Sequence, residues 1–290
     1  MDSDKSNRRR GVYLLPNLLT SAALFAAFYS IISGINGKFE IAAIAVIVAG
    51  ILDGLDGRVA RLTNTQSEFG EQYDSLADLI SFGLAPALLA FNWSLSSLSE
   101  LSAVAGKLGW LAAFLFVACA ALRLARFNTQ VGIADKNYFQ GLASPAAAGT
   151  LVFTIWFFID NGVAGESVRW LIFFETIVLG ILMFSRVRYH SFKAGPGGDK
   201  VPAIWLLLAV LILVLLAIDP PFMGMVFGVA YVFSGLLITV AGRRNRKLKR
   251  EKRPKKEGRT EPVIGSGAPM DEDVPEDTFN DDPGAGKPHD

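Results

Sequence analysis

The chain has little of the chemistry on which many enzymes depend. Its one cysteine, Cys119, excludes an internal disulfide and any cysteine-based metal cluster. Its two histidines, His190 and His289, leave little for histidine catalysis. Charged residues make up only 19% of the 290 residues, whereas 51% are hydrophobic. The hydrophobic residues fall in runs of about 20, the length at which a helix spans a bilayer. The sequence therefore predicts an all-α fold, a polytopic transmembrane helical bundle.

Eight apolar runs separated by turn residues define the expected spans. The first follows a basic N-terminus and is too long for the hydrophobic region of a signal peptide, so we expect it to be retained. Only Pro220-Pro221 divides the last two runs. The prediction is a basic N-terminal segment at 1–13, a membrane domain at 14–242 and a tail at 243–290. The spans are expected at about 14–33, 39–61, 70–91, 108–127, 142–161, 167–186, 201–218 and 221–242.

Basic residues indicate the orientation of the chain. With the N-terminus inside, the outer segments hold only Lys38, Lys107 and Arg169. The positive-inside rule then places both termini in the cytoplasm, which requires an even number of spans. We expect an integral protein of a bacterial-type inner membrane. The inner basic residues ahead of the tail include Arg8, Arg9, Arg10, Arg58, Arg61, Arg123, Arg126, Lys136, Arg186, Arg188, Lys193 and Lys200.

The composition of the chain changes at the start of the tail and again within it. Residues 243–259 are dense in Lys and Arg, and the residues from about 260 are acidic and rich in Pro and Gly. Such a composition cannot build a core, so the tail is predicted to be disordered. The basic run is interpreted as a topology anchor or as a contact for anionic lipid head groups, and the two interpretations are compatible.

Four aspartates lie in stretches that otherwise resemble membrane helix: Asp53, Asp56, Asp74 and Asp78. A carboxylate at the bilayer centre costs about 2.5–3.5 kcal/mol on insertion scales, so four of them need a cation or a water-filled cavity. At 100° per residue, each pair lies on one face of its helix. A polar turn at 62–69 separates the two helices. They are therefore expected to form an antiparallel pair whose acidic faces meet just inside the cytoplasmic boundary.

Oxygen ligands without His or Cys suit Mg²⁺, Mn²⁺ or Ca²⁺, and one or two ions could share four carboxylates. Metal held in this way commonly serves phosphoryl chemistry. A proton or ion pathway is the alternative for the aspartates. A cation transporter should carry acids at several depths, whereas these cluster near one face, and the two halves show no inverted repeat. Gly57 and Ala60, on the acidic face, leave room for a ligand or serve helix packing.

The pattern Asp53-x2-Asp56-Gly57-x2-Ala60-Arg61-x8-Gly70-x3-Asp74-x3-Asp78 resembles the complete signature of the CDP-alcohol phosphotransferases. That family moves a phosphatidyl or similar group from a CDP-linked donor to an alcohol and releases CMP. The resemblance implies that all four aspartates bind divalent metal, Mg²⁺ or Mn²⁺, and that Asp78 also acts as the general base. It implies a nucleotide pocket lined by Gly57, Ala60, Arg61 and Gly70.

The segment from Leu15 to Thr20 resembles an element that many family members carry near the nucleotide. The resemblance adds Pro16, Asn17 and Thr20 to the nucleotide-binding residues. Pro16 is also a good first-turn helix residue, so the alternative interpretation is a helix start at the interface.

Two further segments resemble the phosphatidylserine synthase branch of the family. Arg123-Leu124-Ala125-Arg126-Phe127-Asn128 closes the fourth span, and the run from Phe139 to Ala146 opens the fifth, with Ala143 in place of the usual Pro. Arg123 and Arg126 share a helix face and can pair with the oxygens of the acceptor or the lipid phosphate. The alternative for the arginines is positive-inside anchoring. For Ser144-Pro145 it is an N-cap followed by a first-turn proline.

The resemblance therefore implies transfer of the phosphatidyl group from CDP-diacylglycerol to L-serine, with release of CMP. Another acceptor, such as glycerol 3-phosphate, choline or inositol, is the nearest alternative, and a cation transporter is the second. Apart from these substrates and the lipid bilayer, the expected partner is a second copy of the chain, by resemblance alone. No nucleic acid partner is expected.

Overall fold

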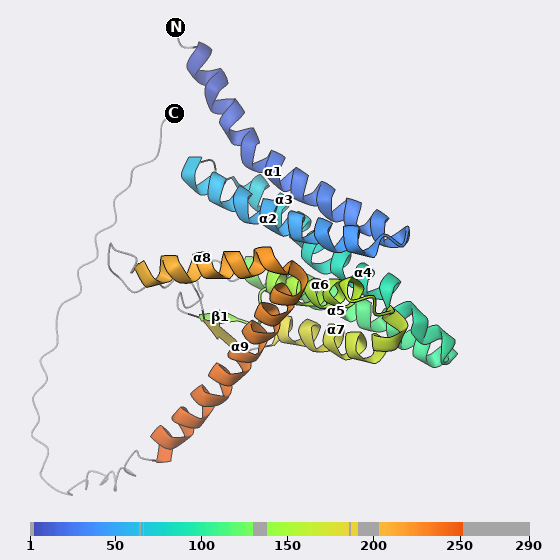
Figure 1. Ribbon diagram of the computed structural model, residues 1–290. Coiled ribbons are helices and arrows are strands. Elements are labelled where there is room, and N and C mark those ends of the chain that lie inside the picture. The colour runs from blue at the N-terminus through green and yellow to red at the C-terminus, as the bar shows by residue number, and fades with distance from the viewer. Residues whose placement is uncertain are drawn as a thin grey trace, which may run out of the picture. The chain divides into compact units, whose positions relative to one another are not determined.

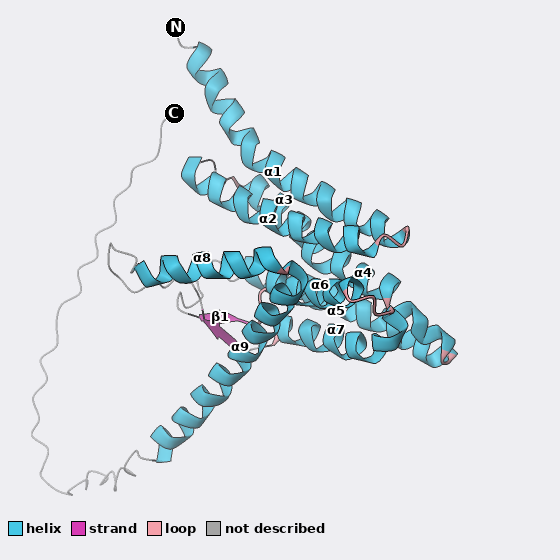
Figure 2. Ribbon diagram, in the orientation of Figure 1, coloured by secondary structure: helices cyan, strands magenta, loops and turns pink. Residues whose placement is uncertain are grey.

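Long helices joined by short connections make up most of the structure. The computed structural model describes residues 3–63, 65, 67–129, 138–185, 187–190 and 203–251. Figures 1 and 2 show the arrangement of the helices. A π-helical turn, η1 (Leu79–Leu84), joins α3 to α4, and 3-10 turns, η2 (Leu95–Glu100) and η3 (Gly165–Val168), precede α5 and α7. The α-helices in these ranges are α1 (Ser3–Ile35), α2 (Phe39–Thr63), α3 (Glu68–Asp78), α4 (Ala85–Trp93), α5 (Ala103–Thr129), α6 (Ser144–Asp160), α7 (Arg169–Phe184), α8 (Ala203–Ile218) and α9 (Pro220–Glu251).

Each predicted span coincides with one helical run, because α3, η1 and α4 form a continuous run from Glu68 to Trp93. The predicted polytopic bundle of membrane helices is confirmed, whereas the full count of eight crossings stays a prediction. α6 is apolar but shorter than a typical span. Five of the described runs are long and apolar enough to cross a membrane: Leu15–Ile35, Glu68–Trp93, Ala103–Thr129, Gly165–Phe184 and Pro220–Leu237.

Two helix boundaries differ most from the predicted ones. α1 begins at Ser3, well before the expected start of the first span, and α9 continues to Glu251, past the expected end at 242. In both helices the backbone hydrogen bonding continues beyond the apolar stretch. Hydropathy therefore does not show where α1 begins or where α9 ends. Residues 252–290 lie outside the described residues, and the disorder of that part of the tail stays a prediction.

Two short strands were not predicted. β1 (Tyr138–Gln140) and β2 (Arg188–His190) pair antiparallel, with Phe139 opposite Tyr189 (Figure 2). Three residues are too few for an alternating pattern to reveal a strand. The pair joins the chain ahead of α6 to the chain after α7.

A glycine turn reverses the chain between α1 and α2. Gly37 has a φ of 73°, a left-handed conformation that glycine adopts without steric cost. Its N–H donates to the Gly34 carbonyl over 3.1 Å, and the Lys38 N–H donates to the Ser33 carbonyl over 2.9 Å. These two bonds are the pair that defines a Schellman motif. The motif sends α2 back antiparallel along α1.

Small side chains let α1 and α2 lie close together over much of their length (Figure 1). Ala27, Ala42 and Ala49 are fully buried. The Ser30 hydroxyl donates to the Ala42 carbonyl over 2.8 Å. In a bilayer, close van der Waals packing and interhelical hydrogen bonds drive helix association. This packing brings the residues of α1 beside the acidic end of α2.

The π-helical turn η1 begins immediately after Asp78. The Ala85 N–H donates to the Ile80 carbonyl five residues back, and Pro86, at the start of α4, has no N–H to donate. The wider turn changes the helical phase, so that Ser81, Phe82 and Gly83 are buried. A π-helical turn inside an α-helix often marks a functional site. Here it separates the acidic segment from the apolar remainder of the span.

Candidate functional site: a carboxylate cluster between three helices

Three aspartates from two helices lie together. Asp53 and Asp56 come from α2 and Asp74 from α3, and one carboxylate oxygen of each lies within 4.8 Å of the others. The connection between α2 and α3 is four residues long, so it holds the ends of the helices together. Asp56 is almost completely buried at 4% exposure. The predicted meeting of the two acidic faces is therefore present.

Asp78 joins this cluster through Asp53, because their carboxyl groups are in hydrogen-bonding contact. One turn separates Asp78 from Asp74 on α3. Oδ1 of Asp78 and Oδ1 of Asp74 are both buried and have no hydrogen-bond partner among the described residues. Buried charged oxygens without partners are costly, so the cluster calls for a positive charge.

The donor set fits a hard divalent cation. All the clustered ligands are carboxylate oxygens, which Mg²⁺, Mn²⁺ and Ca²⁺ prefer. Such an ion would give the two unpartnered oxygens of Asp74 and Asp78 the partner that they lack. The three clustered aspartates can therefore bind a metal ion.

α1 contributes polar groups to the same place. The Thr20 hydroxyl donates to Oδ2 of Asp56 over 2.6 Å and also lies 3.1 Å from the Pro16 carbonyl. Thr20 is buried, at 4% exposure. The Thr20 contact fixes one oxygen of Asp56. Pro16 lies inside α1, not in its first turn, so the interpretation of this segment as a helix start is wrong.

Asn17 lies beside the start of α3. A Cβ on Gly70 would be 3.3 Å from Oδ1 of Asn17 and 3.1 Å from Oγ of Ser67. The Ser67 hydroxyl caps α3 by accepting the Gly70 N–H over 3.0 Å. A side chain at position 70 would therefore crowd both Asn17 and the cap. The structure brings the predicted residues Asn17 and Gly70 together.

The remaining predicted nucleotide residues follow Asp56 on α2. Gly57 is exposed, and a Cβ there would meet no described atom within 4 Å. The space beside it does not support the packing interpretation of this glycine. Ala60 is half-buried, and Nε of the exposed Arg61 donates to the Gly57 carbonyl over 2.9 Å. This end of α2 therefore offers open backbone and a cation next to the carboxylates.

The structure separates the roles of the two arginines at the end of α5. Arg123 is near enough to Asp78 for their charges to interact, and its Nη1 donates to the Ser144 hydroxyl over 2.9 Å. Nη1 of Arg126 donates to the Phe184 carbonyl over 3.1 Å, and its guanidinium lies 5.5 Å from the Phe184 ring centroid. Arg123 therefore belongs to the acidic site, and Arg126 links α5 to the end of α7.

Ser144 is a polar residue of this site that was not among the predicted site residues. The N-cap of α6 is Ala143, which has no side chain able to cap, and Ser144 is the first helical residue. The interpretation of Ser144 as the N-cap is therefore wrong, whereas Pro145 does lie in the first turn. Nothing in the sequence indicated this contact, because it joins residues 21 apart.

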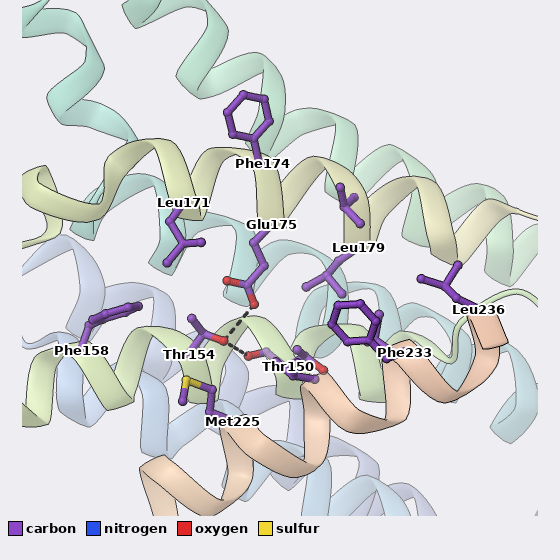
Figure 3. Close-up of a pocket in the computed structure, with 13 residues that line it drawn as sticks. Thr150, Thr154, Phe158, Leu171, Phe174, Glu175, Leu179, Met225, Phe233 and Leu236 are labelled. Atoms are coloured by element: carbon purple, nitrogen blue, oxygen red, sulfur yellow. Dashed lines mark hydrogen bonds between the residues drawn. The ribbon is translucent and has the colours of Figure 1, made fainter.

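A separate cavity of about 460 Å³ lies between α6, α7 and α9 and has an almost wholly apolar lining (Figure 3). Its one acid is Glu175, whose Oε1 accepts the Thr154 hydroxyl over 2.9 Å. The sequence analysis missed this acid within a span. None of the four aspartates lines the cavity.

A family model described as CDP-alcohol phosphatidyltransferase matches residues 13–182, which include every predicted site residue. A protein of Helicobacter pylori is 40% identical over 185 residues, which are 63% of this chain and 74% of that protein. One of Mycobacterium tuberculosis is 32% identical over 203 residues, 66% and 68% of the two chains. One of Saccharomyces cerevisiae is 34% identical over 169 residues, 53% and 58%. All three bear the name CDP-diacylglycerol–serine O-phosphatidyltransferase.

Proposed function

We propose that this chain, which belongs to the CDP-alcohol phosphatidyltransferase family, transfers the phosphatidyl group of CDP-diacylglycerol to L-serine and releases CMP. The observation that carries the proposal is the meeting of three carboxylates, Asp78 and Arg123 within the membrane helices. The relatives' shared name supports serine as the acceptor.

Asp53, Asp56, Asp74 and Asp78 are the proposed ligands of Mg²⁺ or Mn²⁺, as one ion or two. When bound, the metal neutralises the charge of the donor's pyrophosphate and of the leaving CMP. Thr20 holds one oxygen of Asp56 in place, so the other remains to face the ion. Contacts of this kind orient carboxylate ligands and tune their affinity.

The cytidine nucleotide is proposed to lie against α1 and the adjoining ends of α2 and α3. Gly57, Ala60 and Gly70 let the nucleotide approach the backbone, because they carry small side chains or none. Asn17 and Thr20, one turn apart after Pro16, offer polar groups from α1. Arg61 lies at the exposed edge, where it can pair with phosphate oxygens.

The proposed reaction is an in-line displacement at phosphorus. Asp78 takes the proton of the serine hydroxyl as general base. The hydroxyl oxygen forms a bond to the phosphorus that bears diacylglycerol, and the bond from that phosphorus to the CMP oxygen breaks. The products are phosphatidylserine, CMP and the proton held on Asp78. Arg123 lies near enough to Asp78 for their charges to interact.

Arg123 is the proposed partner of the serine carboxylate. Its Nε is buried and has no hydrogen-bond partner among the described residues, and a carboxylate is the natural acceptor for such a group. Arg126, held against Phe184, adds positive charge for the lipid phosphate.

The protein is an integral membrane protein. We further propose that it lies in a bacterial-type inner membrane with its termini and its acidic site on the cytoplasmic side, because the basic residues favour this orientation. A homodimer is also part of the proposal.

An acceptor-swap assay tests the proposal. Purified protein in detergent receives CDP-diacylglycerol and Mn²⁺ with L-serine, glycerol 3-phosphate, choline or inositol, and the lipid product is identified by mass. Phosphatidylserine should form, with each other acceptor giving less than a tenth of its rate. A faster reaction with another acceptor would overturn serine while keeping the catalytic site.

A further inference from the structure

We infer that Ser144 is a positioning residue for acceptor recognition, because its hydroxyl holds Arg123 in the orientation that receives the carboxylate of serine. The inference deepens the proposed function and rests on it. It begins from the 2.9 Å hydrogen bond between Nη1 of Arg123 and Oγ of Ser144.

The Ser144 hydroxyl is not engaged by the end of its own helix. A serine at a helix start usually serves as the N-cap. Here Ala143 occupies that position, and the structure records no side-chain capping bond for α6. Ser144 is nonetheless buried, at 1% exposure. A buried hydroxyl needs a partner, and Arg123 is the partner that the structure shows.

The backbone around Ser144 is fixed to α7. The Leu142 N–H donates to the Leu182 carbonyl over 3.0 Å, and the Gly141 N–H donates to the Val187 carbonyl over 2.8 Å. Gly141 has a φ of 87°, and a Cβ there would collide with the Met183 carbonyl. These contacts leave Ser144 little freedom, so its hydroxyl is a fixed reference point for a long side chain.

The side chain of Arg123 needs a fixed contact of this kind to hold its orientation. Its side chain has several rotatable bonds, and fixing them when a ligand binds costs conformational entropy. The bond to Ser144 engages Nη1, whereas Nε is buried and has no partner among the described residues. A serine carboxylate that pairs with Nε would therefore meet a guanidinium that is already oriented. Preorganisation of this kind raises affinity without adding a contact to the ligand.

The contact between Arg123 and Ser144 also lies where the enzyme would distinguish serine from other acceptors. Arg123 is near Asp78, the proposed base, and near Tyr231 of α9. An acceptor bound through its carboxylate at Arg123 would have its hydroxyl within the same group of residues. Loss of the Ser144 bond should then weaken acceptor binding more than donor binding.

The test measures steady-state kinetics of full-length variants with Mn²⁺, CDP-diacylglycerol and L-serine. Ser144→Ala should raise the KM for serine about tenfold, as expected for one hydrogen bond to a charged group, with the KM for CDP-diacylglycerol within twofold. Ser144→Thr, which keeps the hydroxyl, should have a serine KM within about threefold of the wild-type value. Inhibition by serinol, which lacks the carboxylate, should not change in Ser144→Ala.

Thr150→Val is the matched control, because it removes another buried hydroxyl of α6 whose hydrogen bond goes to the Ala146 carbonyl of its own helix. It should leave the serine KM unchanged. If Ser144→Ala does not fold, Ser144→Cys replaces the oxygen by a weak acceptor at similar volume and should raise the serine KM by a smaller factor.

An unchanged serine KM in the folded Ser144 variants would overturn the inference, as would an equal rise in Thr150→Val. Wild-type protein that releases no CMP in response to serine would instead contradict the proposed function.

Discussion

Asp78 differs from the other three aspartates in its surroundings. It contacts Asp53 on one side and lies near the positive charge of Arg123 on the other, and the π-helical turn begins at the next residue. Asp53, Asp56 and Asp74 instead bring their oxygens together within 4.8 Å. A base needs access to the acceptor, and Asp78 is the one of the four aspartates whose charge acts on the arginine that is proposed to hold the acceptor.

The first prediction concerns Asp78→Asn. The amide cannot accept the serine proton, so kcat should fall by a factor on the order of 10²–10⁴, the usual contribution of a general base. CMP binding, measured by calorimetry with Mn²⁺, should stay within about tenfold, because three carboxylates remain. Asp160→Asn, at the exposed C-terminal end of α6, is the charge-matched control. Full activity of Asp78→Asn would refute the assignment.

The second prediction concerns Thr20→Val. The substitution keeps the side-chain volume but removes the 2.6 Å hydrogen bond to Asp56. Metal affinity should fall about 10–100-fold, as it does when the partner of a metal ligand is removed. Mn²⁺ titration monitored by electron paramagnetic resonance measures the change. Thr20→Ser keeps the hydroxyl and should bind nearly as well as the wild type, and equal affinities in all three proteins would contradict the proposed role.

At the scale of helices, close approach depends on small residues. A Cβ on Gly109 of α5 would lie 2.6 Å from the Leu95 carbonyl of η2, a contact that real structures do not tolerate. A Cβ on Gly180 of α7 would lie 3.3 Å from the Cα of Phe116 of α5, a tight but less severe contact. α5 is therefore held between η2 and α7, which fixes where Arg123 and Arg126 emerge at its other end.

The third prediction compares two glycines. Gly109→Ala should destabilise the protein by about 1–3 kcal/mol, because backbone must move to admit the methyl group. Gly149→Ala on α6, where a Cβ would meet no described atom within 4 Å, should leave stability unchanged or raise it slightly. Thermal unfolding in detergent, followed by intrinsic fluorescence, measures both. Equal midpoints for the two variants would count against the packing described here.

The helices and the acidic faces could be predicted because their signals are local. Asp74 and Asp78 are four residues apart, so helical periodicity alone places them on one face. The contact of Arg123 with Ser144 and that of Arg126 with Phe184 join residues 21 and 58 apart. Such contacts depend on how helices pack, which no local pattern records. The strands β1 and β2 were not predicted for a second reason: three residues are too few to show an alternating pattern.

At the scale of the whole molecule, a polar site lies among membrane helices, and a cation would balance its carboxylates. A ligand that binds only the folded protein stabilises it by mass action. Metal binding and thermal stability should therefore be linked, independently of any catalytic assay.

The fourth prediction uses this linkage. Mn²⁺ at 100 times its dissociation constant should stabilise the protein by about 2.7 kcal/mol, and EDTA should reverse the shift. A variant with Asp53→Asn and Asp74→Asn should show no shift, because two clustered ligands are lost. The midpoint of thermal unfolding measures each effect. A metal-induced shift of the same size in the double variant would place the ion elsewhere.

The most direct test of the whole account is CMP release by the purified wild-type protein from CDP-diacylglycerol, with L-serine added or withheld and with Mn²⁺ or EDTA. The account predicts release that requires both serine and metal. Release that is equally fast without serine, or absent with every acceptor in the presence of metal and an intact fold, would contradict it.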